Sequence, residues 1–346
     1  MARYSAESTP GQRRSYQVWI SAGAVIIVGV GVLAAVRLFQ GPVPNGPQGP
    51  SSALSAQSDV SPVTTQAGPG PAVAGLPQTQ GGPSPAGPLA GGSSPVDVAV
   101  AEALAILNTN PSRLIEVRDK LDDLLKEPMS PAQAQVVKGK LAELADRWLF
   151  GPSVCPGDTL CETYTVKPGE QLRIISERHK VPYEVLMTIN RLPRPEALKA
   201  GQMIKVVDGP FHARVCRSTF TLDVYLQTRF VKTYFVGLGK PGYETPTGGW
   251  MVKPGDKHIK PQWTDPDTGH VYRAEDPDYP LGSRWIGLDG IDGNAAGRTG
   301  FAIHGTNDPN QIGRQGSRGC IRLHNGDAVA VYNMLMPGLS RVQVTD

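Results

Sequence analysis

A histidine and a cysteine stand sixteen residues apart near the end of the chain, in the segment GFAIHGTNDPNQIGRQGSRGCIRLHNGDA. An apolar stretch leads into His304, and a glycine-rich stretch leads into Cys320. A free thiol has a pKa of about 8.5, so a nucleophilic cysteine needs a nearby base or cation at neutral pH. Because an imidazole can take the thiol proton, the pair predicts covalent catalysis with Cys320 as nucleophile and His304 as base.

The residues around the cysteine fit this chemistry. Gly316 and Gly319 carry no side chain that would obstruct the loop, and backbone N–H groups there can face a developing oxyanion. Ser317 adds a hydroxyl donor, or else is an ordinary turn serine. Taken alone, Cys320 and His304 would more often be a buried thiol and a structural histidine, so the wider pattern has to decide.

That wider pattern resembles the signature of the YkuD-type L,D-transpeptidases, in which His-Gly-Thr precedes Ser-x-Gly-Cys-Ile-Arg and then Asn. The matching segments here are His304–Thr306, Ser317–Arg322 and Asn325. Two more segments, TPTGGW at Thr245–Trp250 and LGSRWIGL at Leu281–Leu288, resemble family segments in the same order. Arg318 departs from the pattern, because many members have His or Lys there, and we expect it to tune substrate contact.

The resemblance implies acyl transfer on peptidoglycan stem peptides. Cys320 would attack the carbonyl after the third residue of a tetrapeptide stem, release D-Ala and pass the acyl group to an amine of a second stem. It also implies that a backbone carbonyl orients His304, so Asp308 is not expected as a third catalytic residue. The expected oxyanion or orienting groups are Gly319, Ser317 and Gly305.

Three residues are expected to contact the substrate. Arg322 offers a fork of donors for a carboxylate, or else forms a structural salt bridge within the loop. Asn325 and Trp285 belong to the segments that carry the resemblance. His324 is expected to be structural, and by family analogy the segment Lys253–Tyr279 covers the cleft as a lid.

A C-terminal domain, residues 212–346, must position these groups, and its pattern is β-rich. Apolar and polar residues alternate over Thr219–Leu226, as in a half-buried strand. Further strands are predicted at Val231–Val236, Trp250–Val252, Trp285–Leu288 and Phe301–His304. Only Asp327–Met336 has a helical pattern.

A smaller unit precedes it, at residues 162–208. The pattern predicts a strand at Tyr164–Val166, two short helices and a closing strand at Met203–Val207. This βααβ order and the sequence resemble a LysM module, a family that binds glycans containing N-acetylglucosamine. Glu170 and Arg173 depart from the usual residues.

The same resemblance places the glycan near Pro168, Gly169 and the loop after Asn190. A small domain with a purely structural role is the alternative.

Residues 97–151 have helical periodicity and predict a short bundle of three helices. Asn110 and Ser130 each precede a proline, which predicts a helix start at both places. Residues 40–96 are rich in Gly, Pro and Ser and predict a flexible linker.

The N-terminus predicts a membrane anchor. Residues 15–39 contain the uncharged stretch Ser15–Val36, which would span about 33 Å as a helix. A cleaved signal peptide is the alternative. Arginines within residues 1–14 predict a cytoplasmic N-terminus, so everything after the anchor is expected in the periplasm or cell wall of a bacterium.

Composition excludes other classes of partner. The net charge of +3 over 346 residues, without a dense basic block, argues against nucleic acid. The four cysteines show no zinc spacing, so neither metal nor cofactor is expected. A bridge between Cys155 and Cys161 stays open, because spacing alone cannot show that their Cβ atoms meet.

The predicted fold is therefore multidomain: a single transmembrane helix, a short helical bundle, a LysM module and a β-rich L,D-transpeptidase domain. The expected partners are peptidoglycan stem peptides, glycan strands and the membrane. Alternatives are an L,D-carboxypeptidase, in which water takes the acyl group, attachment of a protein amine to the wall, a cysteine protease, and a non-catalytic wall-binding scaffold.

Overall fold

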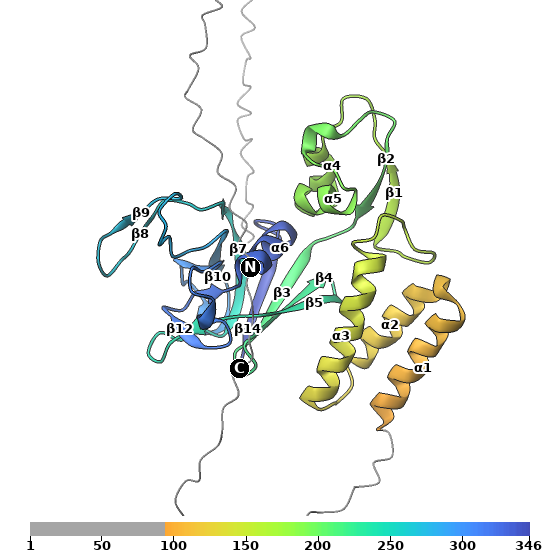
Figure 1. Cartoon of the computed structure of the whole chain (residues 1–346), viewed down its shortest axis with the longest axis horizontal. Coiled ribbons are helices and arrows are strands. Elements are labelled where there is room, and N and C mark those ends of the chain that lie inside the picture. The colour runs from red at the N-terminus through yellow and green to blue at the C-terminus, as the bar shows by residue number, and fades with distance from the viewer. Residues whose placement is uncertain (1–93) are drawn as a thin grey trace, which may run out of the picture. The chain divides into compact units, whose positions relative to one another are not determined.

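The computed structural model describes residues 94–346 of the chain. The predicted cytoplasmic N-terminus (1–14), membrane anchor (15–39) and nearly all of the linker (40–96) lie outside the described residues and stay predictions. None of the helices within residues 94–346 is both long enough and apolar enough to cross a lipid bilayer. This part of the chain forms three helices, a small βααβ module and a β-rich C-terminal domain (Figure 1).

Three α-helices open the described chain: α1 (Pro95–Thr109), α2 (Leu114–Leu124) and α3 (Pro131–Trp148). Ser94 and Ser130 each accept the backbone N–H three residues on, which caps α1 and α3. Asn110 caps the 3₁₀ turn that leads into α2. These oxygens satisfy N–H groups that have no partner inside a helix, and they confirm the starts predicted at Asn110 and Ser130.

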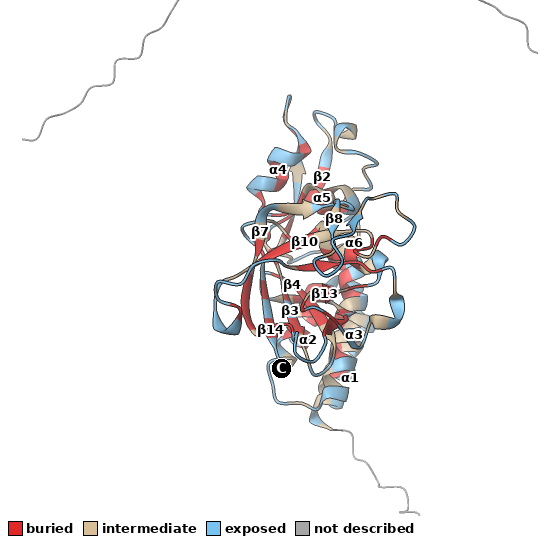
Figure 2. Cartoon of the chain, turned by 90° about the vertical axis from the view of Figure 1, so that its left-hand side faces the viewer, coloured by how far each residue is buried: buried red, intermediate tan, exposed pale blue. Residues whose placement is uncertain are grey.

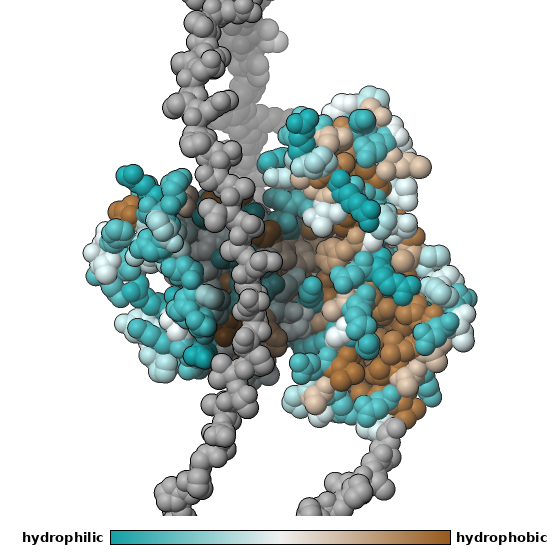
Figure 3. Space-filling view, viewed as in Figure 1, coloured by the Kyte–Doolittle hydropathy of each residue, from teal (hydrophilic) through white to brown (hydrophobic). Residues whose placement is uncertain are grey.

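The apolar stripe of α2 and α3 forms the interior of the bundle. Leu124 of this stripe is half-buried, and its other members are buried: Leu114, Val117, Leu121, Val137, Leu141, Leu144 and Trp148. By contrast, α1 buries only Val100 and Ala103. A cavity of about 320 Å³ lies between α1 and α2, lined partly by Ile106 and Leu124. Figure 3 shows apolar side chains gathered on the surface over these helices. Of the three helices, α1 has the fewest buried residues.

The βααβ module has the predicted element order: β1 (Cys161–Thr165), α4 (Leu172–Arg178), α5 (Tyr183–Ile189) and β2 (Met203–Val207). The strands pair antiparallel, with Cys161 opposite Val207. The helices bury Leu172, Ile175 and Leu186 against them. Cys155 and Cys161 are both free thiols in the structure.

One buried lysine joins this module to the helical bundle. The ammonium of Lys205, on β2, donates to the carbonyls of Trp148, Gly151 and Ser153 at 2.5, 3.0 and 3.0 Å. These carbonyls lie at and just beyond the C-terminus of α3, where the helix leaves them without internal partners and its dipole favours a cation. Lys205 therefore caps a helix of the neighbouring unit.

The C-terminal domain is built on an eight-stranded sheet of order β13-β11-β10-β7-β14-β3-β4-β5. Its strands are β3 (Phe211–Cys216), β4 (Thr221–Leu226), β5 (Arg229–Phe235), β7 (Gly248–His258), β10 (Trp285–Gly290), β11 (Phe301–His304), β13 (Ile321–Arg322) and β14 (Arg341–Thr345). Helix α6 (Asn325–Met334) packs on β10 and β11. Figure 2 shows that the buried residues concentrate along these strands.

Two central strands, β3 and β14, were not predicted. β14, the last strand of the chain, lies between β7 and β3, and it pairs parallel with β3. The other short elements are β6 (Leu238–Gly239), β12 (Gln315–Ser317), β8 (Trp263–Thr264) and β9 (Val271–Tyr272). β8 and β9 form a hairpin inside the segment that was predicted to act as a lid.

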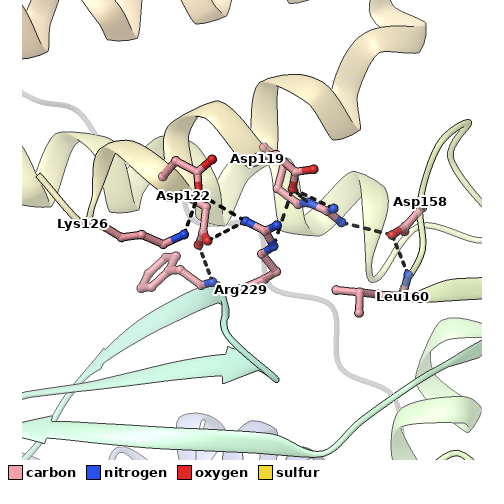
Figure 4. Close-up of polar contacts among 9 residues, drawn as sticks. Asp119, Asp122, Lys126, Asp158, Leu160 and Arg229 are labelled. Atoms are coloured by element: carbon pink, nitrogen blue, oxygen red, sulfur yellow. Dashed lines mark hydrogen bonds and ion pairs between the residues drawn. The ribbon is translucent and has the colours of Figure 1, made fainter.

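The helical bundle packs along β5, an edge strand of the large sheet. Asp122 of α2 is buried and accepts the backbone N–H of Phe230 at 2.8 Å and the guanidinium of Arg229 at 3.1 Å (Figure 4). Lys138 of α3 forms a 2.6 Å ion pair with Asp223 on β4. An edge strand exposes unpaired backbone groups that invite another strand, and the bundle covers that edge.

Replacing Asp122 with alanine is expected to lower the free energy of unfolding by about 3 kcal/mol, because Arg229 and the N–H of Phe230 would lose a buried partner. Asp123→Ala is the matched control, since this neighbouring carboxylate is 64% exposed. Urea denaturation measures both variants. Equal stability of the two would contradict a structural role for Asp122.

Candidate active site

His304 and Cys320 are brought together by two adjacent strands. His304 ends β11 and Cys320 lies directly before β13. The strands pair in parallel with His304 opposite Arg322, so one more step of the register sets Cys320 opposite Ala302. Because side chains along a strand alternate between faces, Cys320, His304 and Arg322 project from the same face of the sheet.

The imidazole of His304 is held in one tautomer. Its Nδ1 lies 2.6 Å from the carbonyl oxygen of Gly305. A carbonyl only accepts, so Nδ1 carries the proton and Nε2 keeps the lone pair that a base requires. Burial, aided by the charge of Arg322, lowers the pKa of His304 to about 4. The ring is therefore neutral at neutral pH.

Trp285 forms one wall beside this histidine. It lies opposite His304 in the β10–β11 pair, and the two rings are nearly parallel, at 20° with centroids 5.8 Å apart. The indole N–H donates to Asp256 at 3.1 Å. Trp285 thus presents its ring to the site, and its only donor is occupied by Asp256.

Two buried hydroxyls lock the loop that carries the cysteine. Ser317 donates to the carbonyl of Cys320 at 2.6 Å and accepts the N–H of Gly319 at 3.1 Å. Thr245 donates to the carbonyl of Gly319 at 2.9 Å and accepts the N–H of Gly239 at 3.1 Å. Both carbonyls next to the thiol are therefore held in fixed directions.

Gly319 is required by its backbone and by its neighbours. Its φ is +105°, in the region that L side chains rarely adopt. A Cβ there would lie 2.5 Å from Cε1 of Phe301. A larger residue would move either the nucleophile loop or the phenyl ring.

These bonds limit which groups can bind an oxyanion. The N–H of Gly319 is used by Ser317, and the hydroxyl of Ser317 is used by Cys320, so both residues orient the loop. The N–H of Cys320 makes no hydrogen bond with any residue between 94 and 346. It is therefore an unpaired donor on the same residue as the thiol.

The thiol of Cys320 is not deprotonated in the resting site. Burial raises the pKa of Cys320, while the backbone N–H of Ala302 and the charge of Arg322 act in the opposite direction. With His304 neutral as well, the resting site holds a neutral thiol and a neutral imidazole. Proton transfer has to accompany attack.

Arg322 is an uncommitted cation at this site. It forms no salt bridge with any residue of the described chain, and its one side-chain hydrogen bond there is a long one of 3.4 Å from Nη1 to the carbonyl of Gly316. Its Nε is buried without a partner. The arrangement leaves the guanidinium able to bind a carboxylate.

Asn325 holds backbone together instead of pointing at an open site. Its side-chain oxygen accepts the N–H of Ser283 at 2.9 Å and of Thr306 at 3.3 Å, and its NH₂ donates to Thr306 O at 2.9 Å. A Cβ on Gly305 would lie 2.2 Å from this oxygen. Asn325 therefore fixes the turn that follows His304.

Two other polar residues lie outside the reacting group. Asp308 accepts from Asn310 and Gln311, at 3.1 and 2.9 Å, and caps a 3₁₀ turn. His324 is exposed at the N-cap of α6. Within residues 94–346, the side chain of neither residue is hydrogen-bonded to His304.

The residues expected to bind glycan divide into two groups. Pro168 and Gly169 are exposed in the turn after β1. Asn190 instead bonds the backbone of Leu186 and Lys205, at 2.7 to 2.9 Å, and ties α5 to β2. A cavity of about 560 Å³ opens beside the turn, lined by Glu170, Arg173, Tyr183, Glu196 and Leu198.

Two features of the site were not predicted. The sequence indicated Thr245 only as part of the segment TPTGGW. Its hydroxyl bonds the carbonyl of Gly319, which lies 74 residues further along the chain. Arg318 bonds Asp265 at 3.3 Å and also contacts Asp267, both in the loop of the β8–β9 hairpin. In the sequence, only the segment TPTGGW and the departure from the family pattern at Arg318 pointed to these residues.

The pH dependence of alkylation reports the resting state of the thiol. The rate at which iodoacetamide modifies Cys320 is expected to rise continuously from about pH 7 to about pH 10, because the thiol pKa lies above its usual range. Mass spectrometry of the Cys320 peptide gives the rate. A plateau near neutral pH that His304→Ala abolishes would instead reveal a preformed thiolate–imidazolium pair.

Thr245→Val keeps the shape of the side chain but removes the hydroxyl. The N–H of Gly239 and the carbonyl of Gly319 would lose a buried partner, so we expect a loss of about 1–3 kcal/mol in unfolding free energy and a changed alkylation rate at Cys320. Thr245→Ser retains the hydroxyl and is the control. Identical behaviour of the two variants would rule out this hydrogen bond as the anchor.

Comparison with known proteins agrees with the arrangement. The YkuD L,D-transpeptidase catalytic domain matches residues 210–344, and the LysM domain matches residues 164–207. The proteins named YkuD of Bacillus licheniformis and Bacillus subtilis are each 31% identical over 189 and 190 residues, which is 53% of this chain and 98% of theirs.

A solved L,D-transpeptidase from Mycobacterium tuberculosis is 18% identical, with a TM-score of 0.32 over 43% of this chain and 64% of that one. The two Bacillus relatives are matched over nearly their whole length. The chain belongs to the YkuD family of L,D-transpeptidases and carries a LysM domain ahead of the catalytic domain.

Proposed function

We propose that this protein forms 3,3 crosslinks between peptidoglycan stem peptides through a thioester on Cys320. The observation that carries the proposal is the shared face of β11 and β13, from which a neutral imidazole with a free Nε2 and an unpaired thiol both project. Family membership supplies the reaction class. Cys320 and His304 are the residues that would perform it.

In the first half-reaction, Sγ of Cys320 attacks the carbonyl carbon after the third residue of a donor stem. Nε2 of His304 takes the thiol proton as the carbon–sulfur bond forms. The imidazolium then gives that proton to the nitrogen of D-Ala as the peptide bond breaks. The products are a thioester and free D-Ala. A histidine with a pKa near 4 gives up the proton readily.

Two groups would stabilise this step. The free N–H of Cys320 is the donor that can face the oxyanion, since Ser317 and Gly319 bond each other. Arg322, on the same face, can bind a substrate carboxylate with its guanidinium. Trp285 would bound the substrate beside His304, and Asn325 would act through the turn that it holds.

In the second half-reaction, an amine of another stem attacks the thioester. His304 removes a proton from the amine and gives it to the departing thiolate of Cys320, which restores the neutral thiol and imidazole of the resting site. If water attacks the thioester instead, the enzyme is an L,D-carboxypeptidase. Cys320 and His304 would then carry out the hydrolysis in the same roles. The buried histidine and half-buried thiol favour an acceptor held in place over bulk water.

The LysM domain would hold the enzyme on glycan strands. Its cavity beside the exposed turn at Pro168 and Gly169 offers Tyr183 and Arg173, whose guanidinium lies 5.4 Å from the tyrosine ring. An aromatic face and polar side chains suit a sugar ring. Wall substrate places the catalytic domain outside the cytoplasmic membrane, which agrees with the anchor predicted at residues 15–39.

Cys320→Ala is expected to abolish crosslinking, because it removes the thiol that would form the thioester. Purified tetrapeptide muropeptides are incubated with wild type or variant, and products are read by mass spectrometry. Dimers joined between third residues, absent with the variant, are the expected result.

Tripeptides without dimers would favour the carboxypeptidase. A cysteine protease would cleave peptides made only of L-residues. Unchanged muropeptides with folded wild-type protein would leave wall binding as the function.

A further inference from the structure

Asp256 lies in a bulge of β7. The pairing of β7 with β10 is interrupted there, and residues 253–256 stand opposite the single residue Gly287 of β10. Extra residues in one strand of an antiparallel pair re-aim the side chains that they carry. The three atoms that a Cβ on Gly287 would meet first all belong to the side chain of Asp256. The carboxylate therefore lies over Gly287, on the side to which a side chain at that position would point.

This side of the sheet is the one that carries the catalytic pair. In the β10–β11 pair, Trp285 stands opposite His304 and Gly287 stands opposite Ala302. Residues directly opposite each other share a face, and so do residues two apart on one strand. Asp256 is thus on the same face of the sheet as the imidazole and the thiol.

Two printed contacts in series join Asp256 to His304. Oδ1 of Asp256 accepts the indole N–H of Trp285 at 3.1 Å. The indole in turn lies nearly parallel to the imidazole, at 20° with centroids 5.8 Å apart. An indole has one polar hydrogen, so this is the only conventional hydrogen bond that Trp285 can donate from its side chain. Trp285 is only half-buried, and the bond to Asp256 adds a directional constraint that packing does not supply.

The carboxylate is held by side chains of its own strand. Nε2 of His258 lies 3.2 Å from Oδ1, and Nζ of Lys253 lies 3.9 Å from Oδ2. The side chains of His258 and Lys253 are 44% and 42% exposed, and that of Asp256 is 29% exposed. Ion pairs with this much exposure contribute little to stability. Replacing Asp256 is therefore expected to change the position of Trp285 more than it changes the stability of the fold.

We propose that Asp256 is a positioning residue for the reaction, which holds the indole of Trp285 against the imidazole of His304 and so keeps water away from the base. The inference rests on the proposed function and extends it by one residue. An apolar wall beside the ring disfavours the charged imidazolium, so it keeps Nε2 free to take the thiol proton. Cys320 and Arg322 face the same imidazole from the β13 side, and neither is altered by a change at Asp256.

Asp256→Ala and Asp256→Asn separate positioning from charge. Both remove a negative charge, which by itself can only lower the pKa of a nearby histidine. Asparagine, however, keeps an oxygen that can accept the indole N–H. The pKa of His304 is read by NMR titration of full-length protein with ¹⁵N-labelled histidine, and His304→Gln identifies the signal.

We expect the pKa of His304 to rise from about 4 toward the ordinary value of about 6.5 in Asp256→Ala, because water would reach the ring once the indole is released. Asp256→Asn is expected to retain the wild-type value. Gly287→Ala is a second way to displace the carboxylate, and it is expected to raise the pKa as Asp256→Ala does.

Trp285→Ala tests whether Asp256 acts through the indole. The pKa of His304 is expected to rise in this variant, and adding Asp256→Ala is expected to cause no further change. A further rise in the double variant would show that Asp256 acts by another route and would overturn the inference. So would a pKa that stays the same or falls in folded Asp256→Ala protein, or one that is equal in Asp256→Ala and Asp256→Asn.

Kinetics connect the position of the ring to the reaction. With a tetrapeptide muropeptide, thioester formation is expected to show a kcat lowered by about tenfold in Asp256→Ala, an unchanged KM, and recovery in Asp256→Asn. An unchanged kcat in Asp256→Ala would reject the positioning role in an active enzyme. If wild type forms no thioester, the proposed function fails, while a raised pKa in Asp256→Ala that Asp256→Asn reverses still supports the contact of Asp256 with Trp285.

Discussion

The parallel pairing of β11 with β13 is the constraint on which the active site depends. These are short strands, and β13 has only two residues, yet their register decides that Cys320, His304 and Arg322 share one face. A shift by one residue would send the thiol to the opposite face, because side chains alternate along a strand. Hydrogen bonds on either side stabilise this register. Asn325 fixes the turn after His304, while Thr245 and Ser317 fix the loop before β13.

Burial sets the chemistry that this geometry performs. A low-dielectric site disfavours both an imidazolium and a thiolate, so it shifts the pKa of His304 down and that of Cys320 up. The resting pair is neutral, in contrast to a thiolate–imidazolium pair. Arg322 adds to this by making a second cation beside His304 costly.

The helical bundle and LysM domain are tied to the catalytic domain and to each other by buried polar contacts. Asp122 binds the edge strand β5, and Lys205 caps α3 from inside the LysM domain. A buried charge without its partner is costly, so these contacts are specific as well as stabilising. The bundle, whose sequence predicts helices but no role, covers the exposed edge of the catalytic sheet.

By its resemblance to a family, the sequence predicted Cys320 and His304 as the catalytic pair, which stays a prediction. By itself, it determined the βααβ module, the helix starts at Asn110 and Ser130, and a β-rich C-terminal domain. These follow from local spacing and capping, which need no distant partner. It did not reveal the central strands β3 and β14, the anchoring by Thr245 or the packing role of Asn325. Each of these joins segments far apart in the chain: Thr245 reaches Gly319, and β14 pairs with β3 across the whole domain. Only the tertiary structure decided them, because a hydrogen bond depends on position in space and sequence spacing records only position along the chain.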